Sequence, residues 1–290
     1  MKFYISALSI VYGGVIYLFI LIIMITILLL IHYIISSNRI EVENIDVKLT
    51  KSPSKTFTIA HVSDIHIRVD EHDRIDSIMR ELSSLKPDLI ALTGDILDNL
   101  IRDDSLEYFS KNVTKIAPVI AVPGNHEEFY EDYEKTMNIF RENGIIILEN
   151  EYTIINNLLF VGLKNNCYLS NNILKDINTS SIDGFVLLAH RPENFNYYCD
   201  PDFILNPNLV LSGHAHGGQF RFFGRGLYSP QQGIFPIYTS GAYKHSICDS
   251  IMVVSRGLGH CDIPIRLNNK FHIPLIKVWK WKENGVHYKW

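Results

Sequence analysis

The chain has 290 residues, a formal net charge of −4 and 47% hydrophobic residues. The slight excess of acidic residues leaves no basic footprint of the kind that nucleic-acid-binding domains carry. The four cysteines, Cys167, Cys199, Cys248 and Cys261, are widely spaced without a C-x-x-C pair, which argues against a zinc cage and favours free thiols over disulfides.

An uncharged segment near the N-terminus is long enough to cross a bilayer. No Asp, Glu, Lys or Arg occurs from Phe3 to Ser37, and residues 15–31 are its most apolar part. A buried soluble helix would rarely be apolar on every face over this length, and a signal peptide would have a shorter apolar core and a small-residue cleavage site. We therefore predict a single-pass membrane anchor over residues 1–39. The flanking basic residues favour a cytoplasmic domain only weakly, so the orientation stays open.

The remaining residues, 40–290, suit one catalytic domain with a substantial core. Its first half alternates strands with helices, which predicts βαβ units and a parallel sheet. The expected elements are an edge strand at 41–49, a turn at 51–55, strands at 57–62, 88–93 and 118–122, and helices at 73–85, 104–116 and 128–142.

The second half is richer in strands. Segments 145–148, 152–155 and 158–163 are expected to be antiparallel, with Asn156-Asn157 as a hairpin turn. Further strands are expected at 185–189, 209–212 and 251–254. Two α/β halves that meet through their sheets would form a four-layer αββα sandwich, which is the fold we predict.

Polar motifs follow the predicted strands, each beside a turn-forming glycine or at the end of an apolar run. In chain order they are Asp64-Ile-His66, Gly94-Asp95, Gly124-Asn125-His126-Glu127, His190 and Gly213-His214-Ala215-His216-Gly217. Open α/β sheets carry their sites at the carboxyl ends of the strands, so these residues are expected to converge. Carboxylates, an amide and imidazoles in one place suit two neighbouring divalent cations, which is a common device for hydrolysing phosphate esters.

With this ordered set the chain resembles the calcineurin-like metallophosphoesterase superfamily, whose pattern is D-x-H, G-D, G-N-H-E, H and G-H-x-H. It is most similar to the membrane-anchored branch that includes UDP-2,3-diacylglucosamine pyrophosphatase-like enzymes. That branch also tends to show two runs that occur here as Gly217-Gly218-Gln219 and Ser255-Arg256-Gly257-Leu258-Gly259. The resemblance covers about residues 57–267 and implies a phosphoesterase that hydrolyses phosphoester or pyrophosphate bonds.

The resemblance also assigns metal ligands. Asp64, His66 and His216 would hold one ion, Asn125, His190 and His214 would hold the other, and Asp95 would bridge the two. A water between the ions would lose a proton near neutral pH and attack phosphorus in line with the leaving oxygen. The resemblance favours manganese, and iron or zinc are alternatives with the same ligand types.

Residues next to the ligands are expected to assist. His126 would stabilise or protonate the leaving oxygen as a general acid, and Glu127 would orient a histidine. Four more residues near the motifs could either line the site, where an arginine can meet a phosphate, or be structural: Arg191, Arg256, His245 and His260.

The expected partners are the membrane and a small or lipid-linked phosphoester. Protein phosphatases of the superfamily continue G-D-x-x-D with Arg-Gly, and that arginine binds phosphate. This chain has Asn99-Leu100 at those positions, which argues against a protein phosphatase. A nuclease or nucleotide phosphodiesterase is the alternative enzyme, but it would need a basic groove, and no Lys/Arg cluster is visible. A catalytically silent membrane scaffold of the same fold is the alternative from another class, but it would be expected to have lost ligands.

Overall fold

The computed structural model describes residues 2–37, 39–48, 56–98, 103–129, 132–229, 231–260 and 265–279. The predicted turn at 51–55, the Asn99-Leu100 pair and Cys261 lie outside these ranges. The cysteines within them, Cys167, Cys199 and Cys248, are free thiols.

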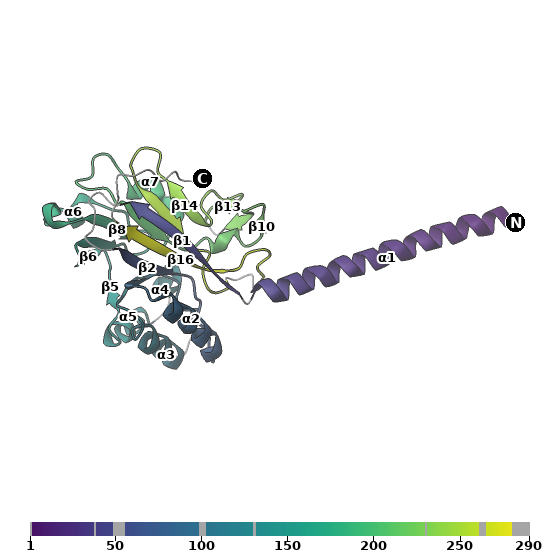
Figure 1. Ribbon diagram of the computed structural model, residues 1–290, viewed down its shortest axis with the longest axis horizontal. Coiled ribbons are helices and arrows are strands. Elements are labelled where there is room, and N and C mark those ends of the chain that lie inside the picture. The colour runs from purple at the N-terminus through teal and green to yellow at the C-terminus, as the bar shows by residue number, and fades with distance from the viewer. Residues whose placement is uncertain are drawn as a thin grey trace.

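A long helix, α1 (Lys2–Ser37), precedes the domain and projects away from it (Figure 1). Its segment Tyr12–Ile31 has a mean hydropathy of 3.2, and none of it is buried. Length and composition allow this helix to cross a membrane, although a signal sequence shares these properties. The first strand begins at Ile40, soon after α1 ends.

The first sheet has six strands in the order β1-β16-β2-β3-β4-β5. Their bounds are β1 Ile40–Lys48, β2 Phe57–Val62, β3 Leu89–Thr93, β4 Val119–Val122, β5 Ile146–Ile147 and β16 Phe271–Trp279. The parallel pairing of β2, β3 and β4 and the edge position of β1 confirm the predictions. The long strand β16 was not predicted; it lies between β1 and β2, parallel to the first and antiparallel to the second.

Helices α2 (His72–Leu85), α3 (Asp103–Val113) and α5 (Tyr133–Glu142) lie on the outer side of this sheet (Figure 1). The α2 helix buries Ile75, Ile78, Met79 and Leu82 at the spacing of one helical face. The predicted single helix at 128–142 is wrong in one respect, because a separate short helix, α4 (Asn125–Phe129), precedes α5. Two of the predicted site residues therefore begin a helix.

The second sheet also has six strands, in the order β14-β15-β9-β8-β7-β6. Their bounds are β6 Glu151–Ile155, β7 Leu158–Gly162, β8 Gly184–Leu188, β9 Leu209–Ser212, β14 Gly241–Lys244 and β15 Ile251–Val254. The β6–β7 hairpin is confirmed, and its turn residues Asn156 and Asn157 have positive φ angles of 51° and 61°. The expectation that segment 145–148 is antiparallel is wrong, because β5 pairs in parallel with β4 in the first sheet.

Three buried apolar layers hold the elements together. One lies between the first sheet and its helices, and a second lies between the two sheets, where side chains such as Ile59, Leu89, Phe160 and Leu211 are completely buried. The third covers the far face of the second sheet, beneath α6 (Asn171–Leu174) and α7 (Phe195–Tyr198). This arrangement confirms the four-layer αββα sandwich.

Two short hairpins occupy the long connection from β9 to β14. They follow the 3-10 helix η3 (His216–Gly218) and consist of β10 Arg221–Phe222 with β11 Arg225–Gly226, and β12 Tyr228–Ser229 with β13 Gly233–Ile234. The first hairpin returns to η3, where the Leu227 amide donates a hydrogen bond of 3.0 Å to the Gly218 carbonyl. These hairpins were not predicted.

Candidate metal centre

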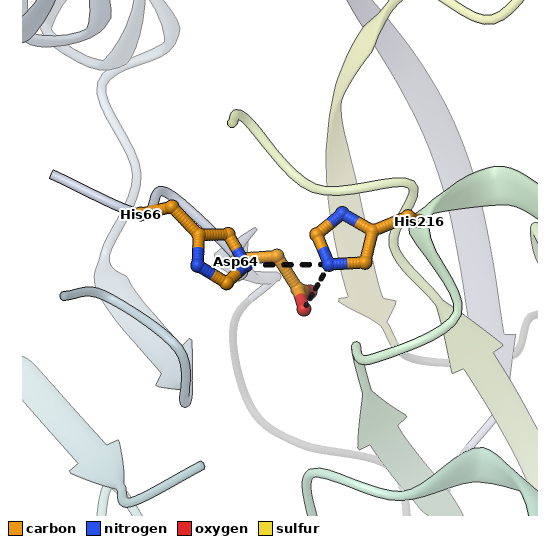
Figure 2. A group of neighbouring side chains, drawn as sticks. All are labelled: Asp64, His66 and His216. Carbon is orange, nitrogen blue, oxygen red and sulfur yellow. Dashed lines mark hydrogen bonds and ion pairs between the residues drawn. The ribbon is translucent and has the colours of Figure 1, made fainter. Parts of the chain in front are cut away.

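Three predicted ligands of the first ion lie together beyond the carboxyl ends of β2 and β9 (Figure 2). His66 Nε2 lies 3.2 Å from His216 Nε2, which lies 3.5 Å from Asp64 Oδ1. All three side chains are buried, and each offers a ligand atom within 4.8 Å of the others. His66 and Asp64 follow β2, whereas His216 belongs to η3 after β9, so the group joins both halves of the domain.

The predicted ligands of the second ion also converge. His190 Nε2 lies 3.2 Å from Asp95 Oδ2, 3.2 Å from Asn125 Oδ1 and 3.1 Å from His214 Nδ1. Asp95 is shared with a third group that contains His66 and His126. Asp95 therefore lies between the first and second groups, which is the position that a bridging ligand needs.

The strand ends turn sharply to aim these side chains inward. Five of the site residues, Asp64, His66, Asp95, His214 and His216, have positive φ angles between 46° and 65°. Such backbone conformations are uncommon outside glycine and cluster at functional sites. Backbone hydrogen bonds hold the turns after β2 and β3 together, because the amides of Asp64 and His66 donate to the carbonyls of Gly94 and Asp95 at 3.0 and 3.1 Å.

Glycines beside the ligands leave no room for a side chain. A Cβ at Gly124 would lie 2.2 Å from Asp95 Oδ1, and a Cβ at Gly213 would lie 2.3 Å from Asp64 Oδ2. The glycines in the G-N-H and G-H-x-H motifs are thus needed for close approach of backbone and carboxylate.

The prediction that Glu127 orients a histidine is wrong. Its buried carboxylate accepts four backbone hydrogen bonds of 2.7 to 3.1 Å, from the amides of Gly124, Asp95, Ile96 and Leu97. Glu127 therefore fixes the loop that carries Asp95 against the start of α4. The sequence places Glu127 three residues after Gly124, but it does not reveal that the loop after β3 lies within reach.

His126 is the most exposed of the imidazoles in the site. Its backbone amide donates a 2.9 Å hydrogen bond to Asp95 Oδ1, and its ring lies edge-on to His66 with centroids 4.6 Å apart. It is half-buried, whereas the imidazoles of His66, His190, His214 and His216 are buried. Among these rings His126 is the one most open to an incoming substrate.

Burial keeps most of these imidazoles neutral. It lowers the pKa of His66 to about 4 and the pKa values of His214 and His216 well below their usual range. Burial also opposes a charge on His190, but the neighbouring Asp95 carboxylate outweighs it and raises the His190 pKa to about 9. Neutral imidazole is the form that binds metal, and a bound cation would also favour the deprotonated form of His190.

The donor arrangement fits divalent cations. His190 Nδ1 lies 2.7 Å from the Thr93 carbonyl, which only accepts, so Nδ1 carries a proton and, in the neutral ring that binds metal, Nε2 carries the lone pair. That lone pair faces the Asp95 carboxylate and the Asn125 oxygen at 3.2 Å, which is a repulsive contact unless a proton or a cation lies between them. Imidazole nitrogen with carboxylate and amide oxygen suits manganese, iron or zinc.

An arginine absent from the predicted set also reaches the site. Arg266 is almost fully buried; its Nη1 donates a 2.7 Å hydrogen bond to the Arg256 carbonyl, and its Nη2 lies 3.3 Å from His216 Nδ1. It follows the undescribed residues 261–264 and belongs to none of the motifs, so no local signal marked it.

The sequence left open whether four residues near the motifs line the site or are structural, and the structure separates them. Arg191 reaches the second group: its Nε donates a 2.7 Å hydrogen bond to Asn165, and its Nη1 lies 3.5 Å from His214 Nε2. The other three are structural in the described part of the chain. Arg256 pairs with Glu41 of β1, His245 Nδ1 accepts the amides of residues 247 and 248, and His260 packs against Phe271.

Comparisons with known proteins show which family the chain is similar to. Residues 57–218 match the profile of the calcineurin-like phosphoesterase family. A relative from Aquifex aeolicus (strain VF5), named an uncharacterized metallophosphoesterase, is 29% identical over 243 residues, which are 79% of this chain and 87% of the relative. The metallophosphoesterase YkoQ of Bacillus subtilis (strain 168) is 26% identical over 87% of this chain and 97% of its own length. The solved structure of TT1561 of Thermus thermophilus has a TM-score of 0.44 at 13% identity and covers 70% of this chain and 91% of that one.

Proposed function

The chain belongs to the calcineurin-like phosphoesterase family, and from this premise we propose that it is a membrane-anchored, metal-dependent hydrolase of phosphoester or pyrophosphate bonds. One observation carries the proposal: two groups of buried donors flank the Asp95 carboxylate. A catalytically silent scaffold would have no reason to keep both groups intact.

The chain's own residues would hold two divalent ions in the way the motifs predicted. Asp64, His66 and His216 form the first group and Asn125, His190 and His214 the second, with Asp95 between them. When bound, such a metal pair lowers the pKa of a water and neutralises charge on the phosphate oxygens.

His126 is proposed as the general acid. Its half-buried ring is next to His66, and its amide is fixed to Asp95 Oδ1 at 2.9 Å, so its position is set by the same carboxylate that joins the two groups. From this position it would deliver a proton to the leaving oxygen, which typically contributes about 10²–10⁴-fold to the rate.

The substrate class follows from the anchor and the motifs. The apolar helix α1 would keep the domain at a membrane. Together with the resemblance to the UDP-2,3-diacylglucosamine pyrophosphatase-like branch, this supports a lipid-linked phosphoester or a small phosphodiester as substrate. The slight acidity of the chain offers little to attract a nucleic acid.

A substrate panel tests the proposal. The full-length chain in nanodiscs is stripped of metal, reloaded with Mn²⁺, and offered phosphomonoesters, phosphodiesters, dinucleotides, single-stranded DNA and nucleotide-diphosphate lipids. We expect metal-dependent hydrolysis with preference for diester or lipid-linked pyrophosphate bonds. Loss of every activity in a metal-loaded protein would favour the scaffold, and preferred cleavage of DNA would favour the nuclease.

A further inference from the structure

The hairpins between β9 and β14 expose large apolar side chains. Phe223 at the tip of the first hairpin is fully exposed, and Ile234, Phe235 and Ile237 are 73–75% exposed. A groove of about 440 Å³ is lined by residues from both regions, including Arg225, Phe235 and Ile237. Phe235 and Ile237 line this groove, and Phe223 and Ile234 are the sequence neighbours of its lining residues Gly224 and Phe235; we call these four exposed side chains the apolar face. Contiguous apolar surface on a soluble domain commonly marks a binding site.

The backbone of the apolar face is strained as well as exposed. Phe223 and Gly224 have positive φ angles of 49° and 80° at the centre of the first hairpin turn, and Phe235 has a φ of 55°. A turn with two positive φ angles favours Asn-Gly, and a bulky residue in this region is a genuine outlier. Exposure of the ring to water and the positive φ angle are both unfavourable for phenylalanine at these positions. An apolar partner would explain why phenylalanine is found there.

The apolar face lies near the membrane helix. Ile40, where the chain leaves α1 and enters β1, pairs with Phe271 of β16. Leu267, four residues before Phe271, pairs with Phe220 at the base of the first hairpin. Because four residues span at most about 14 Å, Leu267 lies within that distance of Phe271, the partner of Ile40. Figure 1 shows both hairpins on the side of the domain from which α1 departs.

The same hairpins are attached to the metal centre. Gly218 of η3 packs so closely on Gly226 of β11 that a Cβ at Gly218 would lie 2.4 Å from the Gly226 Cα. Since His216 begins η3, one short helix connects a predicted metal ligand to the base of the apolar face. The apolar face and the metal centre are thus fixed relative to each other.

Charge in this region suits an anionic surface. From Phe203 to Cys248 the sequence contains no Asp or Glu, whereas Arg221 and Arg225 supply positive charge; Lys244 in the same stretch is paired with Asp249 at 3.1 Å. Basic residues beside an apolar surface are attracted to the acidic phospholipids of a leaflet.

We propose that the apolar face docks on the surface of the bilayer in which α1 is anchored and holds the metal centre at the level of the lipid headgroups. A phosphate carried by a membrane lipid would then reach the site without leaving the bilayer. This inference rests on the proposed function for its substrate, but the docking itself can be measured separately.

Bilayer contact is measured first, without any substrate. The full-length chain is reconstituted in nanodiscs that contain acidic phospholipid with brominated acyl chains, and fluorescence is compared for Phe223→Trp and for a control, Ile154→Trp. Ile154 is 48% exposed and lies on β6, at the opposite edge of the second sheet from β14. We expect brominated lipid to quench the tryptophan at position 223 and not the one at 154, each relative to the unsubstituted chain.

Turnover is measured second, on a lipid-borne phosphoester and on a water-soluble one. The double variant Phe223→Glu/Phe235→Glu should lose about tenfold or more on the lipid-borne substrate, because docking raises the effective concentration of site and substrate. Its rate on the soluble substrate should be unchanged, which also shows that it folds. Ile154→Glu should leave both rates unchanged.

The outcomes separate the two proposals. Equal quenching at positions 223 and 154 would overturn docking. If dimers of the unsubstituted chain were also lost in the double variant, that equal quenching would assign the face to a second copy of the chain. Quenching at position 223 in a protein that hydrolyses neither substrate would retain docking and contradict the proposed function instead.

Discussion

Asp95 is the residue that we propose bridges the two ligand groups. Its carboxylate lies 3.2 Å from His190 and belongs to two of the donor groups. Asp95→Asn removes the negative charge between two cations, so we expect metal content to fall and activity to drop by about a hundredfold or more. Metal analysis and hydrolysis rates measure this. Asp88→Asn, at the other end of β3, where Asp88 bonds to Thr58, is the matched control and should keep both. Full metal occupancy in Asp95→Asn would contradict the bridging role.

His126 should respond differently from Asp95. His126→Ala should keep its metals and lose about 10²–10⁴-fold in turnover on a substrate with a poor leaving group, because the proton donor is gone. The loss should be much smaller for a nitrophenyl ester, whose leaving group needs no proton. Parallel rate measurements on the two esters test this, and equal losses on both would argue against the acid role.

Glu127 is expected to affect folding through four backbone amides. Glu127→Gln replaces one carboxylate oxygen with an NH₂ group, which cannot accept the two amides that this oxygen accepted. Each buried donor left unpaired costs about 1–3 kcal/mol, so we expect a lower unfolding temperature. Glu128→Gln is the control, because Glu128 is only partly buried and accepts the Asn165 side chain at 3.0 Å. An unfolding temperature that falls no further for Glu127→Gln than for Glu128→Gln would refute this account.

At the scale of elements, the sequence predicted those parts of the fold whose signal is local. The strands that lead to the site are short apolar runs that end in polar motifs, and β2 and β9 have the predicted bounds. Strand β16 has no such signal: it contains Pro274, which disfavours a strand, and its partner β2 lies far away in the sequence. The two-residue strands of the hairpins are too short for any periodicity to show.

The ligands could be predicted for the same reason, because each belongs to a local motif at the end of a strand. Their motifs converge because parallel strands end at one edge, so the sequence placed seven donors in one site. The role of Glu127 and the approach of Arg266 to His216 depend on how loops pack after folding, which no local pattern records.

The helix α1 should be separable from the catalytic domain. None of its Tyr12–Ile31 segment is buried, and the first metal motif begins only at Asp64. A chain that starts near Ile40 should therefore fold and keep its rate on soluble phosphoesters, while its rate on a membrane-borne substrate falls. The measurement is the ratio of full-length to truncated rates on the two substrates. Loss of soluble-substrate hydrolysis in a folded, metal-loaded fragment would show that α1 belongs to the catalytic domain.

At the scale of the whole molecule, the candidate metal ligands come from both halves of the domain, which apolar packing holds together. Asp64, His66, Asp95 and Asn125 come from the first sheet, whereas His190, His214 and His216 come from the second. The buried layer between the sheets fixes their distance. Ligands that bind only the folded state stabilise it, so metal should stabilise the domain as a unit.

The most direct test of the central claim is a titration of the metal-free, full-length chain with Mn²⁺. Bound metal, unfolding temperature and phosphodiester hydrolysis are followed in the same samples. We predict that activity is absent without metal and reaches its plateau at about two ions per chain, with a rise in unfolding temperature over the same range. Full activity in the metal-free protein, or a plateau of activity at one ion per chain, would contradict a two-metal phosphoesterase.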